Sequence, residues 1–298
     1  MLVVLITGAS GMLGKEVLNR LVNKSEYLVF TCKHTEPFPD IEPDYIVHCA
    51  AISSQAYNEN NPYEVFEANV NYTQRLIEKY KSEYKPPTII FPSSIAVYGG
   101  DRYHKYIETD IPKPKTLYGI SKLSAEKILK YYHSMGVIKA AIFRLSALTG
   151  YRQSGPVFEI TKKIIDENIQ VVELFGPEFG YVKNYTRCDN VADFFVNYIN
   201  RRILSDAYEY NLCSHRAYSP LDIFNKICSF LVYRKPCIFN YKTYLGDDSI
   251  QANSDLASEI FDWKPNEPTI YDNLREDAII YGAECALSML GQEKKRMD

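Results

Sequence analysis

The feature that most constrains the fold is a short apolar strand that runs directly into a glycine-rich turn and then into a helix. The stretch "LVVLITGASGMLGKEVL" places Gly8, Gly11 and Gly14 three residues apart between the strand and the helix. Glycines let the backbone turn tightly and approach a pyrophosphate, while the N–H groups at the start of a helix favour negative charge. The pattern therefore predicts a dinucleotide site. The residues expected to contact the dinucleotide here are Gly8, Ser10, Gly11, Met12 and Leu13.

Strand-like and helix-like segments alternate through the first half of the chain. Nearly continuous apolar runs, which predict strands, lie at 2–6, 27–32, 44–51, 88–94 and 139–145. Helical patterns lie at 12–21, from Pro62 to about Tyr84 and after Tyr118. Strands that are apolar throughout are typical of a parallel sheet covered on both faces. We therefore expect the α/β class, with a doubly wound parallel Rossmann sheet.

After about residue 150 the elements become shorter. Helical patterns are expected near 156–168, 189–201, 219–232 and 269–286, with strands at "QVVEL" and "YEYNL". We predict a first domain over 1–150, to which some later segments return, a smaller α/β domain over 151–285, and a polar tail over 286–298.

Composition narrows the kinds of partner. The formal net charge is -3, from 34 Lys plus Arg against 37 Asp plus Glu, so no long-range field favours nucleic acid or an anionic membrane. No stretch approaches the roughly 20 apolar residues of a membrane span, and we expect a cytoplasmic protein. The seven cysteines form no C-x-x-C pair and the five histidines are scattered, which favours reduced thiols and no metal site.

The end of the second predicted strand bears on the type of dinucleotide. A carboxylate there would bind the ribose 2′-hydroxyl of NAD, and a basic residue would bind the 2′-phosphate of NADP. The strand ends with Cys32, Lys33 and His34, without an immediate carboxylate. This favours NADP, but Glu36 is close enough to keep NAD as the alternative.

Tyr118 and Lys122 are four residues apart at the start of a predicted helix. That spacing puts both side chains on one helical face, about 5–6 Å apart at Cβ. A nearby ammonium favours the phenolate and would lower the pKa of the tyrosine, as an acid–base pair requires. The chain contains 25 tyrosines, however, and such a pair can also be ordinary surface decoration. The spacing alone leaves both interpretations open.

Several motifs in order resemble one enzyme family. They are "TGASGMLG", "HCAA", "ANVNYTQRLI", "FPSSIAVYG", "YGISK", "YNLCSHRAYSPLDIFNKI" and "IFDWKPNEPTIYDNLREDAIIYG". Together they resemble the extended short-chain dehydrogenase/reductases, specifically the NAD(P)-dependent epimerase/dehydratase group that acts on nucleotide sugars. The resemblance covers nearly the whole chain. It implies NAD(P) binding by the first domain and mainly substrate binding by the second.

The resemblance also implies roles for individual residues. Tyr118 would exchange the proton, and Lys122 would lower its pKa and bind the nicotinamide ribose. Ser94 would polarise the reacting oxygen as well as bind substrate, with Ser93 as the adjacent possibility. The resemblance further places Ala50 and Ala51 along the cofactor and Asn69 as a support of the site.

Departures from the family pattern discriminate between reactions. A 4,6-dehydratase has an Asp-Glu pair, and the fucose-type epimerase-reductases have a cysteine, where this chain has Ile95 and Ala96. Neither of these can move a proton. We expect NADPH-dependent reduction of a 4-keto group on a nucleotide-linked deoxysugar. A 4-epimerase with bound NAD is the alternative, and a sensor or scaffold that binds NADP without turnover is a third hypothesis.

The substrate side matches the family less well. Where the family has two arginines for the nucleotide diphosphate, this chain has Lys183, with Arg187 nearby, and Tyr244. Arg152, Lys183 and Arg187 are the expected substrate contacts, although ordinary solvation of each is an open alternative. The family glycine in the N-V-x-G-T motif is Tyr72 here. The resemblance also implies a homodimer built from the Pro62 and Tyr118 helices.

Overall fold

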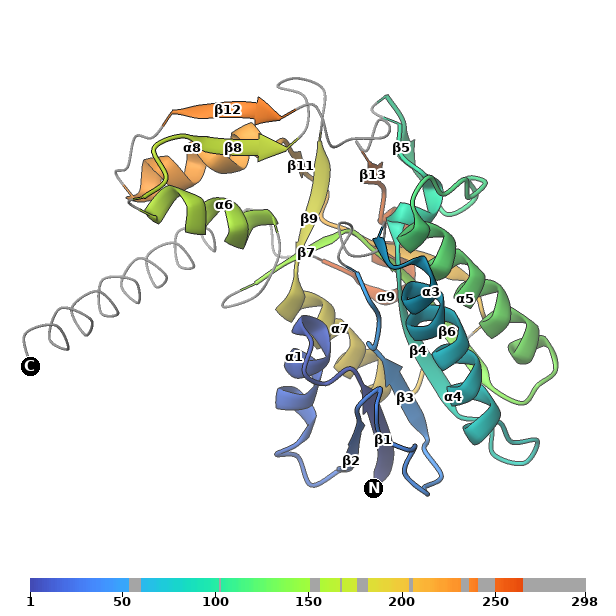
Figure 1. Ribbon diagram of the computed structural model, residues 1–298. Helices are drawn as coiled ribbons and strands as arrows, with labels where there is room; N and C mark the ends of the chain where they lie inside the picture. The colour runs from blue at the N-terminus through green and yellow to red at the C-terminus, as the bar shows by residue number, and fades with distance from the viewer. Residues whose placement is uncertain are drawn as a thin grey trace, which may run out of the picture.

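The structure is a computed structural model. It describes residues 1–53, 60–101, 103–150, 156–166, 168–175, 182–203, 206–231, 236–240 and 250–264. Over these residues, strands and helices alternate around a central sheet (Figure 1). Within the same residues no helix has the length and apolar character to cross a membrane, and no three His, Cys, Asp or Glu side chains gather as metal ligands.

The central sheet has six parallel strands. In sequence order they are β1 (Leu2–Thr7), β2 (Tyr27–Cys32), β3 (Tyr45–His48), β4 (Thr88–Ser94), β6 (Lys139–Leu145) and β10 (Glu209–Leu212). Their order in the sheet is β10-β6-β4-β3-β1-β2. The order reverses at β1, since β2 lies on one side of it and β3 on the other. The prediction of a doubly wound parallel Rossmann sheet is confirmed, and such sheets bind ligands at the carboxyl ends of the strands beside this reversal.

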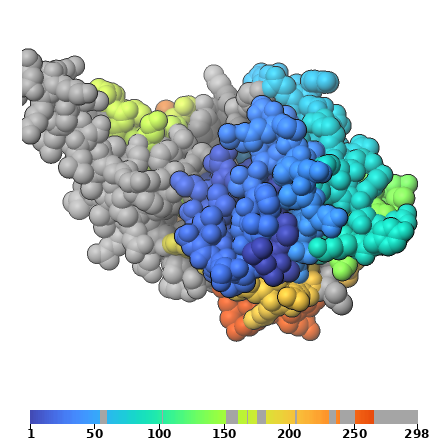
Figure 2. Space-filling model, turned by 90° about the horizontal axis from the view of Figure 1, so that it is seen from below, coloured from blue at the N-terminus to red at the C-terminus, as the bar shows by residue number. Residues whose placement is uncertain are grey.

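Helices cover both faces of the sheet. One face carries α1 (Met12–Leu21), α7 (Cys188–Asn200) and α9 (Asp255–Phe261), and the other carries α3 (Pro62–Phe66), α4 (Tyr72–Tyr80) and α5 (Leu117–Ser134) (Figure 1). Along β1, Val4 and Ile6 enter the first core and Leu5 enters the second, because successive side chains of a strand point to opposite faces. Seen from the end where the chain begins, N-terminal residues (blue) lie at the front, beside the cyan to teal residues of α3 and α4 and above the yellow and orange residues of α7 and α9 (Figure 2).

The second half of the chain contributes to two layers. α7 and β10 join the central sheet, whereas α6 (Pro156–Ile165), β8 (Val172–Phe175), α8 (Pro220–Leu231) and β12 (Cys237–Asn240) pack around a core of their own (Figure 1). Between these layers, β9 (Lys183–Arg187) pairs with β7 (Ala147–Thr149) and β11 (Ala217–Tyr218). The division of the chain near residue 150 stays a prediction. The expected last helix and the tail lie outside the described residues.

The helix expected from Pro62 to about Tyr84 is not uniform. It consists of α3, the π-helical turn η1 (Glu67–Asn71) and α4, and Lys81 already leaves the helical conformation. A π-turn adds a residue to a helical turn and often occurs beside functional sites. Here the turn carries Asn69, which the sequence indicates as a support of the site.

Candidate active site

The glycine turn between β1 and α1 packs tightly against the segment that follows β3. A Cβ atom on Gly8, whose φ is +68°, would lie 2.5 Å from the Ala50 nitrogen, and one on Gly14 would lie 2.2 Å from the Gly8 oxygen. Gly11 is the N-cap residue of α1, where no side chain caps the helix and no acidic residue lies in the first turn. The N–H groups and the dipole at this helix end are therefore suited to a phosphate group.

A cleft of about 840 Å³ extends from this turn to the start of α5. It brings together eight of the residues expected from the sequence: Gly11, Met12, Leu13, Ala51, Ser94, Tyr118, Lys122 and Lys183. The glycine turn and the Tyr118 motif thus face one common space at the carboxyl ends of the strands. A volume of this size lies within the range that is usual for small-molecule sites.

The contact between Tyr118 and Ser94 follows from how α5 begins. Thr116 caps the helix by accepting a hydrogen bond from the Gly119 nitrogen at 3.1 Å, and Gly119 packs so closely on Ala96 that a Cβ atom would lie 2.5 Å from its oxygen. Ser94 ends β4 two residues before Ala96 and forms a side-chain hydrogen bond with Tyr118. Burial raises the pKa of Tyr118 to about 12, although the bond with Ser94 lowers it.

Lys122 is buried beneath Tyr118. Its Nζ atom donates to the Pro92 oxygen at 2.7 Å and lies 5.9 Å from the centre of the Tyr118 ring. Burial lowers the pKa of Lys122 to about 8, while Cys49 and Glu126 raise it. The expected lowering of the Tyr118 pKa by Lys122 is not found in this structure, because the ammonium points to a backbone carbonyl and burial of the phenol dominates.

The structure separates the two adjacent serines. Ser93 is buried and donates a hydrogen bond to Glu126 on α5, whereas Ser94 bonds Tyr118 at the cleft. Both serines line the cleft and bond side chains of α5, but only Ser94 bonds Tyr118.

A chain of buried hydrogen bonds connects the glycine turn with η1. Thr73 donates to the Asn69 oxygen at 2.8 Å, so its hydroxyl oxygen must accept from Nε2 of His48, 2.8 Å away. Nδ1 of His48 then accepts from Thr7, 2.6 Å away, which in turn accepts from the Ala50 nitrogen. Each donor in this chain has an acceptor only if His48 is neutral and carries its proton on Nε2. Burial agrees, since it lowers the pKa of His48 to about 3.

Asn69 supports the cleft from behind and does not line it. Its side chain accepts from the Ile52 nitrogen at 2.7 Å and donates to the Ile52 oxygen at 3.0 Å. It also donates to Ser121 on α5 at 3.0 Å. These bonds fix the segment after β3 relative to the Tyr118 helix. Gly8, Ser10 and Ala50 likewise belong to the surrounding segments and do not line the cleft.

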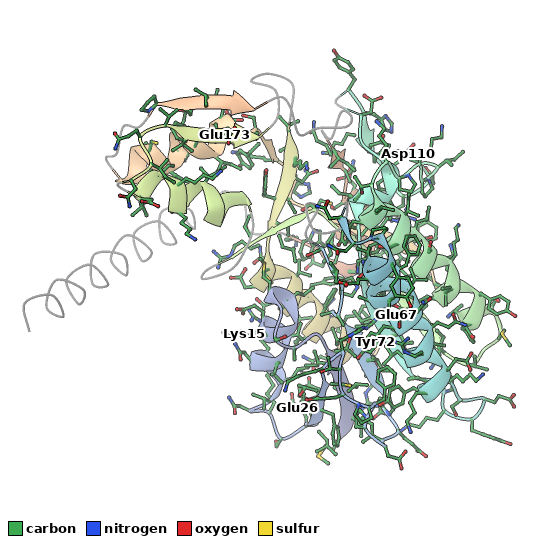
Figure 3. The ribbon with its side chains drawn as sticks, viewed as in Figure 1. Lys15, Glu26, Glu67, Tyr72, Asp110 and Glu173 are labelled. Carbon is green, nitrogen blue, oxygen red and sulfur yellow. The ribbon has the colours of Figure 1, made fainter. Side chains whose placement is uncertain are left out.

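The residues that bear on the cofactor type lie at the end of β2. Nζ of Lys33 lies 3.1 Å from Oε1 of Glu36, and both side chains are exposed. The ring of His34 packs against Tyr72, with ring centres 4.8 Å apart. Tyr72, which replaces the family glycine, is buried at the start of α4, near Glu67 of η1 (Figure 3). This end of the sheet therefore offers Lys33 and Glu36 together.

Among the described residues, all the charged side chains that line the cleft are lysines. Its charged lining residues are Lys115, Lys122 and Lys183, and no Asp or Glu of the described chain lines it. A cleft lined by lysines favours an anionic ligand. Arg187 does not line it, because its guanidinium pairs with Asp189, Nε to Oδ1 at 2.6 Å. Arg152 and Tyr244 lie outside the described residues.

Sequence reasoning missed several lining residues that a positional rule could have found. Lys115 stands in "PKPK" directly before the helix that carries Tyr118, and Nζ of Lys115 donates to the Gly100 oxygen at 2.8 Å. Ser146 directly follows β6, and ligands meet such an α/β sheet at the carboxyl ends of its strands. Cys49 likewise follows the end of a strand, β3. Burial raises the pKa of its thiol to about 12, so the thiol is not a nucleophile at neutral pH.

Comparison with known proteins agrees with this arrangement. The sequence model of the NAD dependent epimerase/dehydratase family matches residues 4–188. A UDP-glucose 4-epimerase of Streptococcus mutans is 24% identical over 88% of this chain and 91% of its own length. A GDP-6-deoxy-D-talose 4-dehydrogenase of Aggregatibacter actinomycetemcomitans is 24% identical over 78% of this chain and 81% of its own length.

Solved structures resemble the chain in fold. RMD from Pseudomonas aeruginosa, complexed with NADPH, superposes with a TM-score of 0.81 at 17% identity, covering 95% of this chain and 100% of its own. A UDP-glucuronic acid 4-epimerase from Bacillus cereus, in complex with UDP-glucuronic acid and NAD, superposes with a TM-score of 0.82 at 21% identity, covering 95% and 99%.

Proposed function

Because the chain belongs to the NAD dependent epimerase/dehydratase family, we propose that it reduces the 4-keto group of a nucleotide-linked deoxysugar, with NADPH as the reductant. The observation that carries this proposal is that Ser94, Tyr118 and Lys122 face the same cleft as the glycine turn at the start of α1. A keto group bound in this cleft would lie beside the hydroxyl groups of Ser94 and Tyr118, and a phosphate group would lie at the glycine turn.

Reduction of a ketone needs a hydride at carbon and a proton at oxygen. Bound NADPH supplies the hydride. Tyr118 donates the proton to the developing alkoxide, and Ser94 donates a hydrogen bond to the same oxygen, as an oxyanion-hole donor does. A pKa of about 12 keeps Tyr118 protonated at neutral pH, which is the state that a proton donor requires.

Lys122 binds the ribose next to the nicotinamide. Its ammonium is held by the Pro92 oxygen, within the same cleft as Tyr118. A binding cofactor displaces water from the cleft and brings its own charge, so the pKa of Tyr118 depends on occupancy. The cation of oxidised nicotinamide favours the phenolate, which Lys122 alone does not achieve in this structure.

The other family reactions receive less support. Neither Ile95 nor Ala96 has an ionisable side chain, so neither can transfer the proton that a dehydratase or a carbon-acid epimerase requires. A 4-epimerase remains the second candidate, because the Streptococcus relative is one and because Glu36 stands beside Lys33. An epimerase must first take a proton from the sugar hydroxyl, so Tyr118 would have to be the phenolate that bound oxidised nicotinamide favours.

The substrate contributes an anionic group. Lys183 and Lys115 line the cleft and bind the nucleotide diphosphate as point charges, without the fork geometry of arginine. We also propose a homodimer through α5 and the helix that begins at Pro62 and extends from α3 to α4. Ile120 and Tyr131 on α5 are exposed, at 38% and 62%, which suits a partner helix, whereas Leu123 and Ile128 pack inside the subunit.

One experiment separates the candidates. The purified protein is denatured and the released nucleotide is identified by chromatography, and NADPH oxidation is then followed with a panel of 4-keto-sugar nucleotides. We expect little bound NAD and turnover with NADPH. Tyr118→Phe should lower kcat at least 10²-fold while keeping the affinity for NADPH. Tyr103→Phe, an exposed tyrosine at 84%, is the matched control.

Stoichiometric NAD in the supernatant would favour the epimerase. Unchanged turnover of Tyr118→Phe would overturn the proposed chemistry. NADPH binding without turnover of any keto-sugar nucleotide would instead favour the sensor or scaffold hypothesis.

A further inference from the structure

We propose that the buried ion pair between Glu126 and Arg144 is a positioning device, which fixes Ser94 on β4 against Tyr118 and Lys122 on α5. The inference rests on the proposed function, because it concerns the residues that carry the chemistry there. Glu126 and Arg144 do not line the cleft, and they act through the residues that do.

The pair is bidentate and completely enclosed. Arg144 donates from Nε to Oε1 of Glu126 at 3.1 Å and from Nη2 to Oε2 at 2.8 Å. The side chains are 3% and 0% exposed. Such a fork-to-fork pair defines direction as well as distance. Apolar residues can often replace a buried ion pair without loss of folding stability, so stability alone does not account for this pair.

The pair binds the chain on both sides of Ser94. On one side Ser93 donates to Glu126. On the other, the turn η2 (Ile95–Tyr98) follows Ser94 directly, and Arg144 donates from Nη1 to the hydroxyl of Tyr98 at 3.0 Å. Arg144 also stands opposite Ser93 in the register of β4 and β6. Two bonds from one ion pair thus leave Ser94 little freedom to move.

The ion pair also acts on α5, the helix that carries Tyr118 and Lys122. Glu126 follows Lys122 by one turn of α5, so both lie on one helical face. The Glu126 carboxylate is one of the groups that raise the pKa of Lys122 against the effect of burial. The titratable or charged groups around Lys122 are His48 and Cys49 at the end of β3, Tyr118 and Glu126 on α5, and Arg144 on β6, which reaches them through Glu126.

The test uses full-length protein and the variant Glu126→Gln. Glutamine keeps the shape but not the charge. Lys122 is followed by ¹⁵N NMR of Nζ-labelled lysine, and NADPH oxidation is followed with a keto-sugar nucleotide. We expect Lys122 to lose its proton at lower pH than in the wild type. We also expect kcat to fall about 10²-fold with little change in KM, since misplacement of reacting groups costs rate more than binding.

Two further variants test the connection to Ser94. Ser93→Ala removes the bond between β4 and Glu126 and leaves both charges of the ion pair in place, and we expect kcat to fall by about tenfold, the effect of one hydrogen bond, with the Lys122 titration unchanged. Glu209→Gln is the control. Glu209 lies 3.4 Å from Arg144 and 3.0 Å from Lys130, and has no bond to Ser93. It should keep both the wild-type rate and the wild-type Lys122 titration.

Glu126→Gln leaves Arg144 buried without the Glu126 carboxylate, a loss that can by itself prevent folding. The double variant Glu126→Met with Arg144→Met removes both charges and keeps apolar volume. If the folded double variant has the wild-type kcat and Lys122 titration, the inference is wrong. If the wild type turns over no keto-sugar nucleotide, the proposed function fails, yet the Lys122 titration of these variants still decides whether the pair acts on that residue.

Discussion

Lys33 and Glu36 form an ion pair at the end of β2, with Nζ of the lysine 3.1 Å from Oε1 of the glutamate. The bond from Lys33 holds the pKa of Glu36 below its ordinary value, so the carboxylate is charged at neutral pH. These two residues indicate opposite cofactors when the sequence is read alone. In the structure they form an exposed ion pair, so their opposite charges offset one another at this end of the sheet.

Substitution at this pair should change the preference between the two cofactors. Glu36→Gln frees Lys33 and removes a negative charge, so we expect tighter binding of NADPH by about fivefold to tenfold, the effect of one charge-assisted hydrogen bond. Lys33→Met should weaken NADPH binding by a similar factor and leave NADH binding nearly unchanged. Fluorescence titration with both nucleotides measures this, and equal effects on NADPH and NADH would contradict it.

The lysines of the cleft should determine affinity for the nucleotide part of the substrate. Lys183→Met and Lys115→Met each remove one positive charge from a lining that has no carboxylate among the described residues. We expect each to raise the inhibition constant of the free nucleoside diphosphate by about fivefold to thirtyfold at low salt, with less effect as salt screens the charge. Lys127→Met, an exposed lysine on α5, is the matched control. If the lysines only solvate the surface, all three variants will behave alike.

His48 should make the protein lose stability in acid. Its pKa is 6.5 in an ordinary setting and about 3 in the fold, so below pH 6.5 the unfolded chain binds a proton that the folded chain does not. This contribution is fully present above pH 6.5. It decreases by about 1.4 kcal/mol for each pH unit as the pH falls from 6.5 towards 3.

Urea unfolding between pH 4.5 and 7.5 measures this effect. Against the wild type, His48→Asn should show a shallower dependence of the unfolding free energy on pH by up to one proton. The ¹⁵N shifts of the His48 ring should also show the tautomer with the proton on Nε2 at neutral pH. Equal pH slopes, or a proton on Nδ1, would contradict the hydrogen-bond chain from Thr7 to Asn69.

Local pattern was sufficient for most of the strands and for the glycine turn. The runs at 2–6, 88–94 and 139–145 are mostly apolar because the strands that they form are largely buried in a parallel sheet, whereas the run at 27–32 forms the edge strand β2 and is partly exposed. The interruption of the Pro62 helix was not predictable in this way. The π-turn exists where Asn69 bonds Ile52, a contact across 17 residues that no local periodicity records.

The candidate site divides in the same manner. Motifs with a fixed spacing identified Gly11, Ser94, Tyr118 and Lys122, and the fold brings them to one cleft. Lys115 carries no such spacing, and its place in the lining depends on how the loop before α5 packs on Gly99 and Gly100.

The sequence by itself determined the order of strands and helices, the glycine turn and the place of Tyr118 and Lys122 on one helical face, because each depends on neighbours within a few residues. Only the tertiary structure decided the electrostatics of the site. Burial raises the pKa of Tyr118, and Glu126 meets Arg144 from strand β6. Desolvation and long-range contacts arise only when distant segments pack together, so spacing along the chain cannot report them.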